Sequence, residues 1–271
     1  MNQRADFELG LLLDAIYHQY HYDFRSYSEA SLRRRLGAAL IHFGCETLSR
    51  LQDRVLREPA LFTDLLRFLT VQVSDMFRDP IYFRALRDVA VPYLRTYPAL
   101  KIWIAGCASG EEVYSLAIVL HEEGLLDRTQ LYATDINPES LRMAEQGVYE
   151  LDRFAKFSEN YRASGGKSSL SDYYTTAYGG GVIDARFRKR VVFSDHSLAT
   201  DSVFAEMQLV SCRNVLIYFE KELQEHALGL LNDSLCRRGF LGLGNKETLR
   251  FSQLAPEYEE TAPDARLYRR L

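Results

Sequence analysis

The sequence predicts an α/β protein with a mostly parallel, doubly wound sheet, an all-helical domain before it and a small antiparallel β insertion within it. Apolar residues recur at helical spacing through the first ~75 residues. From about residue 100, strand-like and helix-like stretches alternate, which is typical of parallel βαβ units. A glycine- and serine-rich stretch then interrupts this alternation. We therefore expect a helical domain with its linker at 1–78 and an α/β domain at 79–271, with the insertion at about 165–193.

The amino-terminal domain is predicted to contain a series of amphipathic helices. The first, FELGLLLDAIYHQY, has an apolar face at helical spacing. This face comprises Phe7, Leu11, Leu12 and Ile16. The second, SYSEASLRRRLGAALIHFG, has Ser28 or Ser31 as its N-cap and Gly44 as its stop. The stretches ETLSRLQDRVL and ALFTDLLRFL complete the domain.

The α/β domain is predicted from alternating segments. KIWIAGC and LYATDIN are strand-like, whereas EEVYSLAIVLHEEG and PESLRMAEQGVY are helix-like. The strands continue with RVVFSDH, MQLVSCRNVLIYF and FLGLGNKET, and KELQEHALGLLNDSLCRRG adds a helix. The insertion, SGGKSSLSDYYTTAYGGGVIDARFRKRVVF, is interpreted as an antiparallel hairpin. Ligands of doubly wound sheets lie at the carboxyl ends of the strands, so the functional residues are expected there.

Charge and composition exclude several classes of protein. A formal net charge of −4 provides no overall positive field for nucleic acid or an anionic membrane. His18 and His21 have no evident third ligand nearby, so we predict no metal site. The chain shows neither a signal-peptide pattern nor an apolar stretch long enough to span a bilayer, so we expect a cytoplasmic protein. The scattered cysteines form no CxxC pair, which argues against a zinc ribbon and a disulfide scaffold; they are Cys45, Cys107, Cys212 and Cys236.

The turn between KIWIAGC and the next helix suggests the ligand. Its glycines, Gly106 and Gly110, match neither the dinucleotide nor the phosphate-loop pattern, and Glu111 and Glu112 would repel a pyrophosphate. Asp135 ends the next strand, where an acid accepts hydrogen bonds from ribose hydroxyls. S-adenosylmethionine fits, because its sulfonium and amino groups are cationic and tolerate nearby carboxylates. The alternative is a generic strand–turn–helix with surface acids.

The chain resembles the CheR-type chemoreceptor methyltransferases. The resemblance rests on TVQVSDMFRDPIYF, IAGCASGEEVYSLAI, YATDIN and SCRNVLIYF, in the order and spacing of that family, and covers nearly the whole chain. It implies a Rossmann-like S-adenosylmethionine-dependent methyltransferase fold and methylation of glutamate side chains on the cytoplasmic domains of bacterial chemoreceptors, in chemotactic adaptation. The product would be S-adenosylhomocysteine. Two alternatives stay open, which are another signalling protein as substrate and a regulatory module without turnover.

The same resemblance implies roles for individual residues. Arg78 would hold the methionine carboxylate, and Tyr218 would lie near the transferred methyl group, so these two are predicted as catalytic. Glu112 would face the methionine amino group, whereas Glu111 is interpreted only as an acid at a helix start. The predicted cofactor-binding residues are Gln72, Ser74, Arg78, Gly106, Glu112, Asp135, Ser197, Leu198, Arg213 and Asn214. This sequence departs from the family pattern at Gln72, Ser74, Ser197, Asn245 and Lys246.

The resemblance also implies how a protein substrate would dock. Arg33, Arg34 and Arg35 lie on a predicted helix that the family uses against the acidic methylation region of its receptor, although a solvated helix face is the alternative. The insertion around 179–181 offers a sheet edge that some relatives use to bind a receptor peptide. An acceptor glutamate, with a pKa of about 4.3, needs no general base. Nothing in the sequence demands an oligomer, so we expect a monomer that neither binds nucleic acid nor inserts into a membrane.

Overall fold

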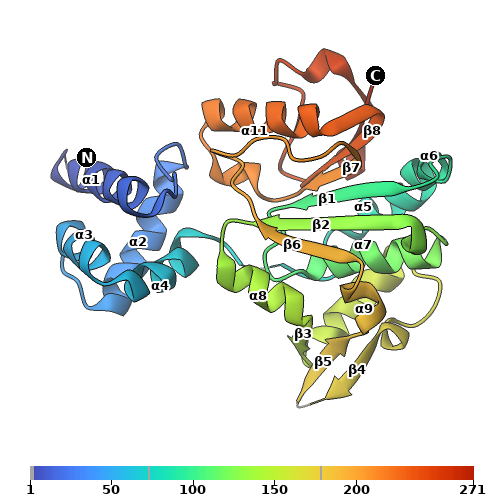
Figure 1. Cartoon of the computed structure of the whole chain (residues 1–271), viewed down its shortest axis with the longest axis horizontal. Helices are drawn as coiled ribbons and strands as arrows, with labels where there is room; N and C mark the ends of the chain where they lie inside the picture. The colour runs from blue at the N-terminus through green and yellow to red at the C-terminus, as the bar shows by residue number, and fades with distance from the viewer. Residues whose placement is uncertain (1–2, 73, 178) are drawn as a thin grey trace. The chain divides into compact units, whose positions relative to one another are not determined.

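The computed structural model describes residues 3–72, 74–177 and 179–271. The chain folds into two compact units. The first comprises Met1–Gln72 together with Tyr218–Gln224, and the second comprises Val73–Ile217 and Glu225–Leu271. The first unit is therefore built from two stretches that are far apart in the sequence. Figure 1 labels the main helices and strands of both units.

The first unit contains the helices that the sequence predicts. They are α1 (Gln3–Tyr20), α2 (Glu29–Phe43), α3 (Leu48–Arg57) and α4 (Pro59–Leu69). Gly44 ends α2 with a left-handed backbone at φ 63°, and the Thr47 side chain caps α3 by accepting a hydrogen bond from the Arg50 N–H. Residues 218–224 join this unit through an antiparallel bridge between Tyr27 and Phe219 and a hydrogen bond from the Glu220 N–H to the Ser26 carbonyl.

The buried face of α1 differs from the predicted one. Phe7 and Leu11 are 68% and 40% exposed, so their assignment to the core was wrong. Leu12 and Ile16 of the predicted face are buried, together with Leu9 and Leu13, which the prediction left out. At about 100° per residue, Phe7 and Leu11 lie roughly 160° from Leu9 around the helix. A leucine-rich stretch offers more than one apolar face, and packing against the neighbouring helices decides between them.

The second unit is built on a seven-stranded sheet in the order β6-β2-β1-β7-β8-β10-β9. The first five strands in this order run parallel, whereas β10 pairs antiparallel with both β8 and β9. The predicted mostly parallel sheet is thus confirmed, while β9 and β10 were not predicted. The strand bounds are β1 (Leu100–Ala105), β2 (Thr129–Asp135), β6 (Val191–Asp195), β7 (Met207–Cys212), β8 (Leu235–Leu243), β9 (Tyr258–Ala262) and β10 (Leu267–Arg270).

Helices connect and cover this sheet. Alternation along β1 points Ile102 and Ile104 into the main core with α7, and buries Trp103 against the rings of His196 and Phe204 on the opposite side. The α-helices are α5 (Pro80–Ala85), α6 (Val91–Leu94), α7 (Glu111–Glu122), α8 (Pro138–Gln146), α9 (Arg153–Ala163), α10 (Ala185–Arg188) and α11 (Lys221–Ser234). A π-helix, η1 (Leu86–Ala90), joins α5 to α6. The 3-10 helices are η2 (Leu126–Arg128), η3 (Leu170–Tyr173), η4 (Leu216–Tyr218), η5 (Ala255–Glu257) and η6 (Pro263–Ala265).

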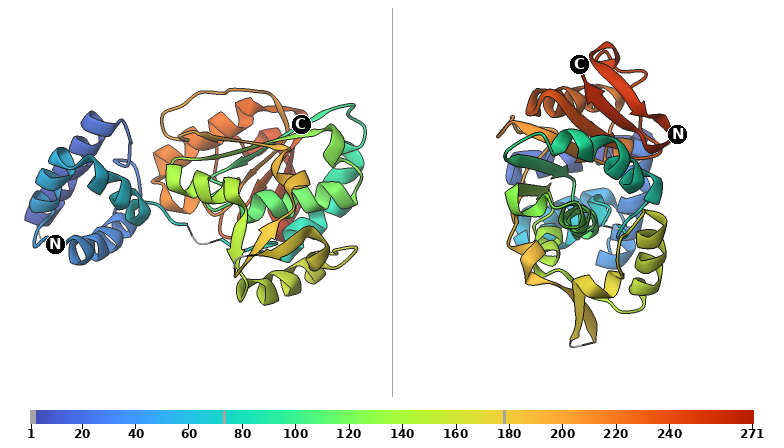
Figure 2. Two further views of the ribbon diagram at one scale, coloured as in Figure 1. Left: turned by 60° about the horizontal axis from the view of Figure 1, so that its bottom comes forward. Right: turned by 90° about the vertical axis from the view of Figure 1, so that its right-hand side faces the viewer.

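A small antiparallel sheet projects from the second unit beside α9 (Figures 1 and 2). It contains β3 (Val148–Glu150), β4 (Tyr174–Ala177) and β5 (Gly180–Ile183), in the order β3-β5-β4. The prediction placed this insertion at 165–193. The structure differs at both ends, because β3 precedes that range and residues from 191 onward belong to the main sheet. A three-residue strand after a helix is too short to produce a recognisable alternation.

Candidate active site

The predicted cofactor residues of the second unit gather at one edge of the main sheet. Because β6, β2, β1 and β7 are parallel neighbours, their carboxyl ends lie side by side. Gly106 directly follows β1, Asp135 ends β2, and Arg213 follows β7. Ser197 and Leu198 follow β6 closely. The strand order therefore brings together residues that are more than a hundred positions apart in the chain.

Asp135 is a fixed hydrogen-bond acceptor at the end of β2. Its Oδ2 accepts the Ala108 N–H and its Oδ1 accepts the Asn137 N–H, both at 2.9 Å. Burial raises the pKa of Asp135, and these backbone N–H groups oppose the rise. A carboxylate offers about four lone pairs, so both oxygens retain capacity for hydroxyl donors. This is the property that recognition of a ribose requires.

The two glycines of the turn are required by the packing of the protein itself. Gly106 has φ 70°, and a Cβ there would lie 2.4 Å from Cγ2 of Val215. Gly110 has φ 90°, and a Cβ there would lie 2.9 Å from Cβ of Ala144 in α8. Close approach of a ligand is therefore not needed to explain either glycine. The two glycines by themselves therefore do not indicate a ligand.

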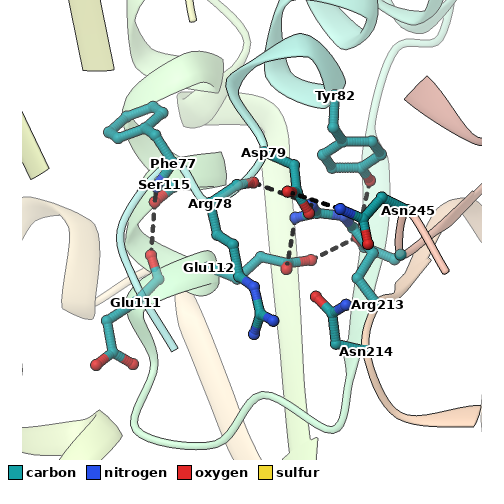
Figure 3. A network of polar contacts seen from close by, with 12 residues as sticks. Phe77, Arg78, Asp79, Tyr82, Glu111, Glu112, Ser115, Arg213, Asn214 and Asn245 are labelled. Carbon is teal, nitrogen blue, oxygen red and sulfur yellow. Dashed lines mark hydrogen bonds and ion pairs between the residues drawn. The ribbon is translucent and has the colours of Figure 1, made fainter. Parts of the chain in front are cut away.

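A buried arginine joins three of the predicted segments (Figure 3). The Arg213 side chain is 1% exposed, and its Nη1 donates to Oε2 of Glu112 at 2.9 Å. Its Nη2 donates to the Arg78 carbonyl and to Oδ2 of Asp79, each at 2.9 Å. The guanidinium also stacks on Tyr82, with Cζ 4.1 Å from the ring centroid. Arg213 thus fixes the turn that carries Arg78.

Glu112 is oriented by donors on both carboxylate oxygens. The Ser211 hydroxyl donates to Oε1 at 2.6 Å, opposite the bond from Arg213 to Oε2. Ser211 lies in turn 2.7 Å from the Tyr82 hydroxyl. These bonds leave lone pairs on both oxygens of Glu112. The predicted contact with an amino group stays a prediction, and this geometry is compatible with it.

Residues 74–79, the Arg78 segment, are held by side chains of other elements. The Phe77 N–H donates to Oγ of Ser115 in α7 at 2.8 Å. The Asn160 amide, from α9, donates to the Met76 carbonyl at 3.1 Å. The segment has no regular secondary structure, so these bonds replace the ones that a helix or strand would provide.

Backbone strain concentrates around this edge of the sheet. Phe77 and Asp79, on either side of Arg78, have φ values of 53° and 56°. Ala108 in the glycine turn and Asn214 after β7 have φ values of 48° and 61°. A left-handed backbone costs residues other than glycine about 1–3 kcal/mol, and such residues cluster at functional sites. The strain indicates that the surrounding contacts fix these segments tightly.

Glu111 is more than an acid at a helix start, so that interpretation was wrong. Its side chain is fully buried, and burial raises its pKa. Oε1 accepts Nη1 of Arg153 at 2.9 Å, and Oε2 accepts the Ser109 hydroxyl at 2.7 Å. The other nitrogen of Arg153, Nη2, donates to the Ser74 carbonyl. Arg153 was not predicted, because it lies 42 positions from Glu111 in the sequence.

Glu247 is a second residue that sequence reasoning missed. This buried carboxylate accepts the N–H groups of Asn214, Val215 and Gly244 at 2.9, 2.8 and 2.6 Å. It thereby holds the loop after β7 in place, including the left-handed Asn214. The departure from the family pattern at Asn245 also acquires a contact, since its amide donates to Oδ1 of Asp79 at 3.3 Å.

Comparison with known proteins identifies the family. The description "CheR methyltransferase, SAM binding domain" matches residues 72–262, and "CheR methyltransferase, all-alpha domain" matches residues 8–70. The chain belongs to the CheR methyltransferase family. It is 55% identical over 268 residues to "Putative methyltransferase Cher3" of Pseudomonas putida, covering 99% of this chain and 98% of that protein. It is 31% identical over 199 residues to "Chemotaxis protein methyltransferase 2" of Pseudomonas aeruginosa, covering 70% and 68% respectively.

The charges at the strand ends fit S-adenosylmethionine, which is the methyl donor of the CheR methyltransferases. The Arg78 guanidinium would suit the carboxylate of its methionine part, and Glu112 would suit the amino group. The Asp135 carboxylate would suit the ribose hydroxyls. Among the described residues, no cluster of three or more histidine, cysteine or acidic side chains could hold a metal ion. Within the same residues, no helix is long and apolar enough to cross a membrane.

The remaining cofactor predictions have local partners. Ser197 forms a tight turn, in which its N–H donates to Oδ2 of Asp201 at 2.8 Å and its hydroxyl accepts the Ala199 N–H at 3.3 Å. Leu198 beside it is buried. Gln72 belongs to the first unit, where its amide donates to the Thr70 hydroxyl at 3.4 Å.

Tyr218 and the predicted docking arginines belong to the first unit. The Arg35 guanidinium lies over the Tyr218 ring, 4.5 Å from its centroid, and donates to the Leu69 carbonyl at 2.5 Å. Arg33 forms ion pairs within the unit, whereas Arg34 is exposed. The three arginines of the helix are therefore not equivalent.

Proposed function

We propose that this protein transfers a methyl group from S-adenosylmethionine to glutamate side-chain carboxylates on the cytoplasmic domains of bacterial chemoreceptors. Membership of the CheR methyltransferase family supports the reaction type. The relatives named chemotaxis protein methyltransferases support the choice of substrate. The observation that carries the proposal is the bonding of Arg213 to both Glu112 and the Arg78 segment, because it fixes oppositely charged groups at one edge of the sheet.

The residues of the chain have to bind and orient rather than to exchange protons. S-adenosylmethionine supplies, when bound, a methyl group activated by a cationic sulfur. A glutamate acceptor is already ionised at neutral pH, since its pKa is about 4.3, and needs no base. Arg78, Glu112 and Asp135 would bind the donor, and alignment of the two reactants can supply on the order of 7–11 kcal/mol at the upper limit. Tyr218 would orient the acceptor carboxylate.

The test combines binding with product analysis. Purified protein is titrated with S-adenosylhomocysteine by calorimetry, and then incubated with receptor cytoplasmic fragments and donor carrying a labelled methyl group. We expect binding, and transfer of a label that mild alkali releases as methanol, because a carboxyl methyl ester is labile to base. An alkali-stable label would contradict glutamate as acceptor. Binding without any transfer to the receptor fragments would contradict the proposed reaction on chemoreceptors.

Two variants separate the roles of the predicted catalytic residues. Arg78→Ala should abolish most binding of S-adenosylhomocysteine, whereas Arg84→Ala, a change of an exposed arginine in α5, should leave it intact. Tyr218→Phe should slow methyl transfer and leave binding of S-adenosylhomocysteine nearly unchanged. Equal losses of rate and affinity in Tyr218→Phe would make that residue part of the donor site instead.

A further inference from the structure

The adjacent acids Glu111 and Glu112 each hold a different arginine. Glu112 pairs with Arg213, whose Nη2 binds the Arg78 carbonyl near the end of the Arg78 segment. Glu111 pairs with Arg153, whose Nη2 binds the Ser74 carbonyl at the start of the same segment. The half-buried Arg153 guanidinium therefore fixes the start of this irregular stretch of backbone, and the buried Arg213 guanidinium fixes its end.

Arg153 is suited to this task by its own surroundings. It is the first residue of α9, and its guanidinium lies over the Phe157 ring, 4.8 Å from the centroid. Its Nη2 also lies 3.4 Å from Oδ1 of Asp75. The planar guanidinium can donate to Glu111 and to Ser74 at the same time from two nitrogens in a fixed geometry, which an ammonium group cannot do.

We propose that Arg153, oriented by Glu111, is a positioning residue that sets the affinity for the methyl donor through Arg78. This inference rests on the proposed function, in which Arg78 binds the methionine carboxylate. The segment contains the left-handed Phe77 and Asp79 on either side of Arg78. Loss of the bond at Ser74 lets this strained backbone relax towards commoner conformations, which displaces the Arg78 guanidinium from the donor site.

A double-mutant cycle on Arg153 and Arg78 tests the proposal. Binding of S-adenosylhomocysteine is measured by calorimetry for the native protein, Arg153→Met, Arg78→Ala and the double variant. We expect about a tenfold loss for Arg153→Met and a larger loss for Arg78→Ala. Because Arg153 acts through Arg78, the double variant should bind as weakly as Arg78→Ala, within about twofold. Losses that multiply in the double variant would overturn the proposal.

Turnover supplies a second readout that a purely structural role would not produce. In Arg153→Met, the KM for S-adenosylmethionine should rise while kcat at saturating donor stays close to the native value. Arg153→Lys should recover only part of the affinity, because it keeps the charge beside Glu111 but has one nitrogen in place of the two that reach Glu111 and Ser74. A fall in kcat with an unchanged KM would contradict the proposal.

Matched variants keep the result interpretable. Arg162→Met changes an exposed arginine on the same helix and should bind like the native protein. Should Arg153→Met fail to fold, Glu111→Gln removes the charge that orients Arg153 and should give a smaller loss that disappears in the Arg78→Ala background. Native affinity in Arg78→Ala would refute the donor site of the proposed function. A large loss in Arg78→Ala with multiplying losses in the cycle would refute only this inference.

Discussion

Helix α7 begins with two adjacent glutamates, and two more stand at its last residue and C-cap; the two pairs differ in their partners. Glu111 and Glu112, at the beginning, bind separate arginines that extend to the Arg78 segment. Glu122 and Glu123, at the end, share one arginine, Arg87, whose side chain is 7% exposed. The first pair thus holds the Arg78 segment, whereas the second pair binds the π-helix η1 through Arg87 and the stretch after α9 through Lys167.

The surroundings shift the pKa values of Glu111 and Glu122 in opposite directions. Burial raises the pKa of Glu111, and its bonds with Ser109 and Arg153 do not reverse the rise. Burial would also raise the pKa of Glu122, but hydrogen bonds from the Tyr161 hydroxyl, the Lys167 N–H and Arg87 outweigh it and lower that pKa. Acids at the carboxyl end of a helix are disfavoured by the helix dipole, so these partners also offset the dipole. Similar dipeptides therefore differ in role according to how completely their charges are compensated.

The largest effect is expected on stability, when the arginine shared by Glu122 and Glu123 is removed. Arg87→Met removes a buried cation from both carboxylates, although Glu123 keeps its pairs with Lys167 and Arg95, and should lower the free energy of unfolding by about 3–5 kcal/mol. Urea unfolding measures this loss. The folded fraction should bind S-adenosylhomocysteine like the native protein. Arg95→Met is the control, since that arginine pairs with Glu123 but is 53% exposed and should cost under about 1 kcal/mol.

The charge of Glu247 is compensated in a third way, by backbone N–H groups. Among the described residues, no cation is bonded to it. Glu247→Gln keeps one acceptor oxygen and should lower the free energy of unfolding by about 1–3 kcal/mol. It should also weaken binding of S-adenosylhomocysteine about tenfold, because Asn214 loses its fixed position. Loss of stability with unchanged affinity would separate Glu247 from the donor site.

The opposite pKa shifts predict opposite changes in the dependence of stability on pH. The lowered pKa of Glu122 contributes stability above the ordinary value of 4.5, and this is lost as pH falls through the folded-state pKa. The raised pKa of Glu111 costs stability above 4.5, and the cost disappears as pH falls through its folded-state pKa. Each pKa unit of difference between the folded and unfolded states is worth about 1.4 kcal/mol.

Urea unfolding between acid and neutral pH therefore distinguishes the two acids. In Glu122→Gln, the free energy of unfolding should rise less steeply with pH than in the native protein, and the two should differ in slope at pH values below 4.5. In Glu111→Gln, it should rise more steeply than in the native protein, and the two should differ in slope at pH values above 4.5. Slopes that change in the same direction would show that the two pairs of glutamates are electrostatically alike.

The smallest effect is expected where an arginine is exposed rather than buried. Arg34→Glu should weaken methylation of receptor fragments about three- to fivefold at low salt, with a smaller effect at high salt, because rim charges act mainly through association rates. Binding of S-adenosylhomocysteine should not change. Arg50→Glu makes the same charge change at an exposed position of α3, in the same unit, and should leave methylation unaltered.

Local sequence patterns were enough to predict the strands β1, β2, β6 and β7 and the acid that ends β2. Each of these strands is a short apolar run, and Asp135 stands directly at the end of one. The partners of Glu111 and Glu122 could not be predicted, because Arg153 and Arg87 lie 42 and 35 positions away from them. Burial of a polar side chain depends on contacts between distant segments, which no local pattern reports.

Short or locally ambiguous elements account for the other differences. Strand β3 has three residues, and β10 has four, which is too few for a clear alternation. The leucine-rich α1 could be assigned a wrong apolar face, since Phe7 and Leu9 are both apolar and only tertiary packing buries one of them. In both cases the deciding information lies outside the segment itself.

The inclusion of residues 218–224 in the helical unit limits how the protein can be divided. A fragment that begins after Gln72 would retain these residues while losing Tyr27 and Ser26, to which Phe219 and Glu220 are bonded. Tyr218 would also lose Arg35, which stacks on its ring. Expression of the carboxyl-terminal portion alone would therefore leave residues 218–224, which include the first turn of α11, without these contacts, so an inactive truncation would say little about the chemistry of the sheet.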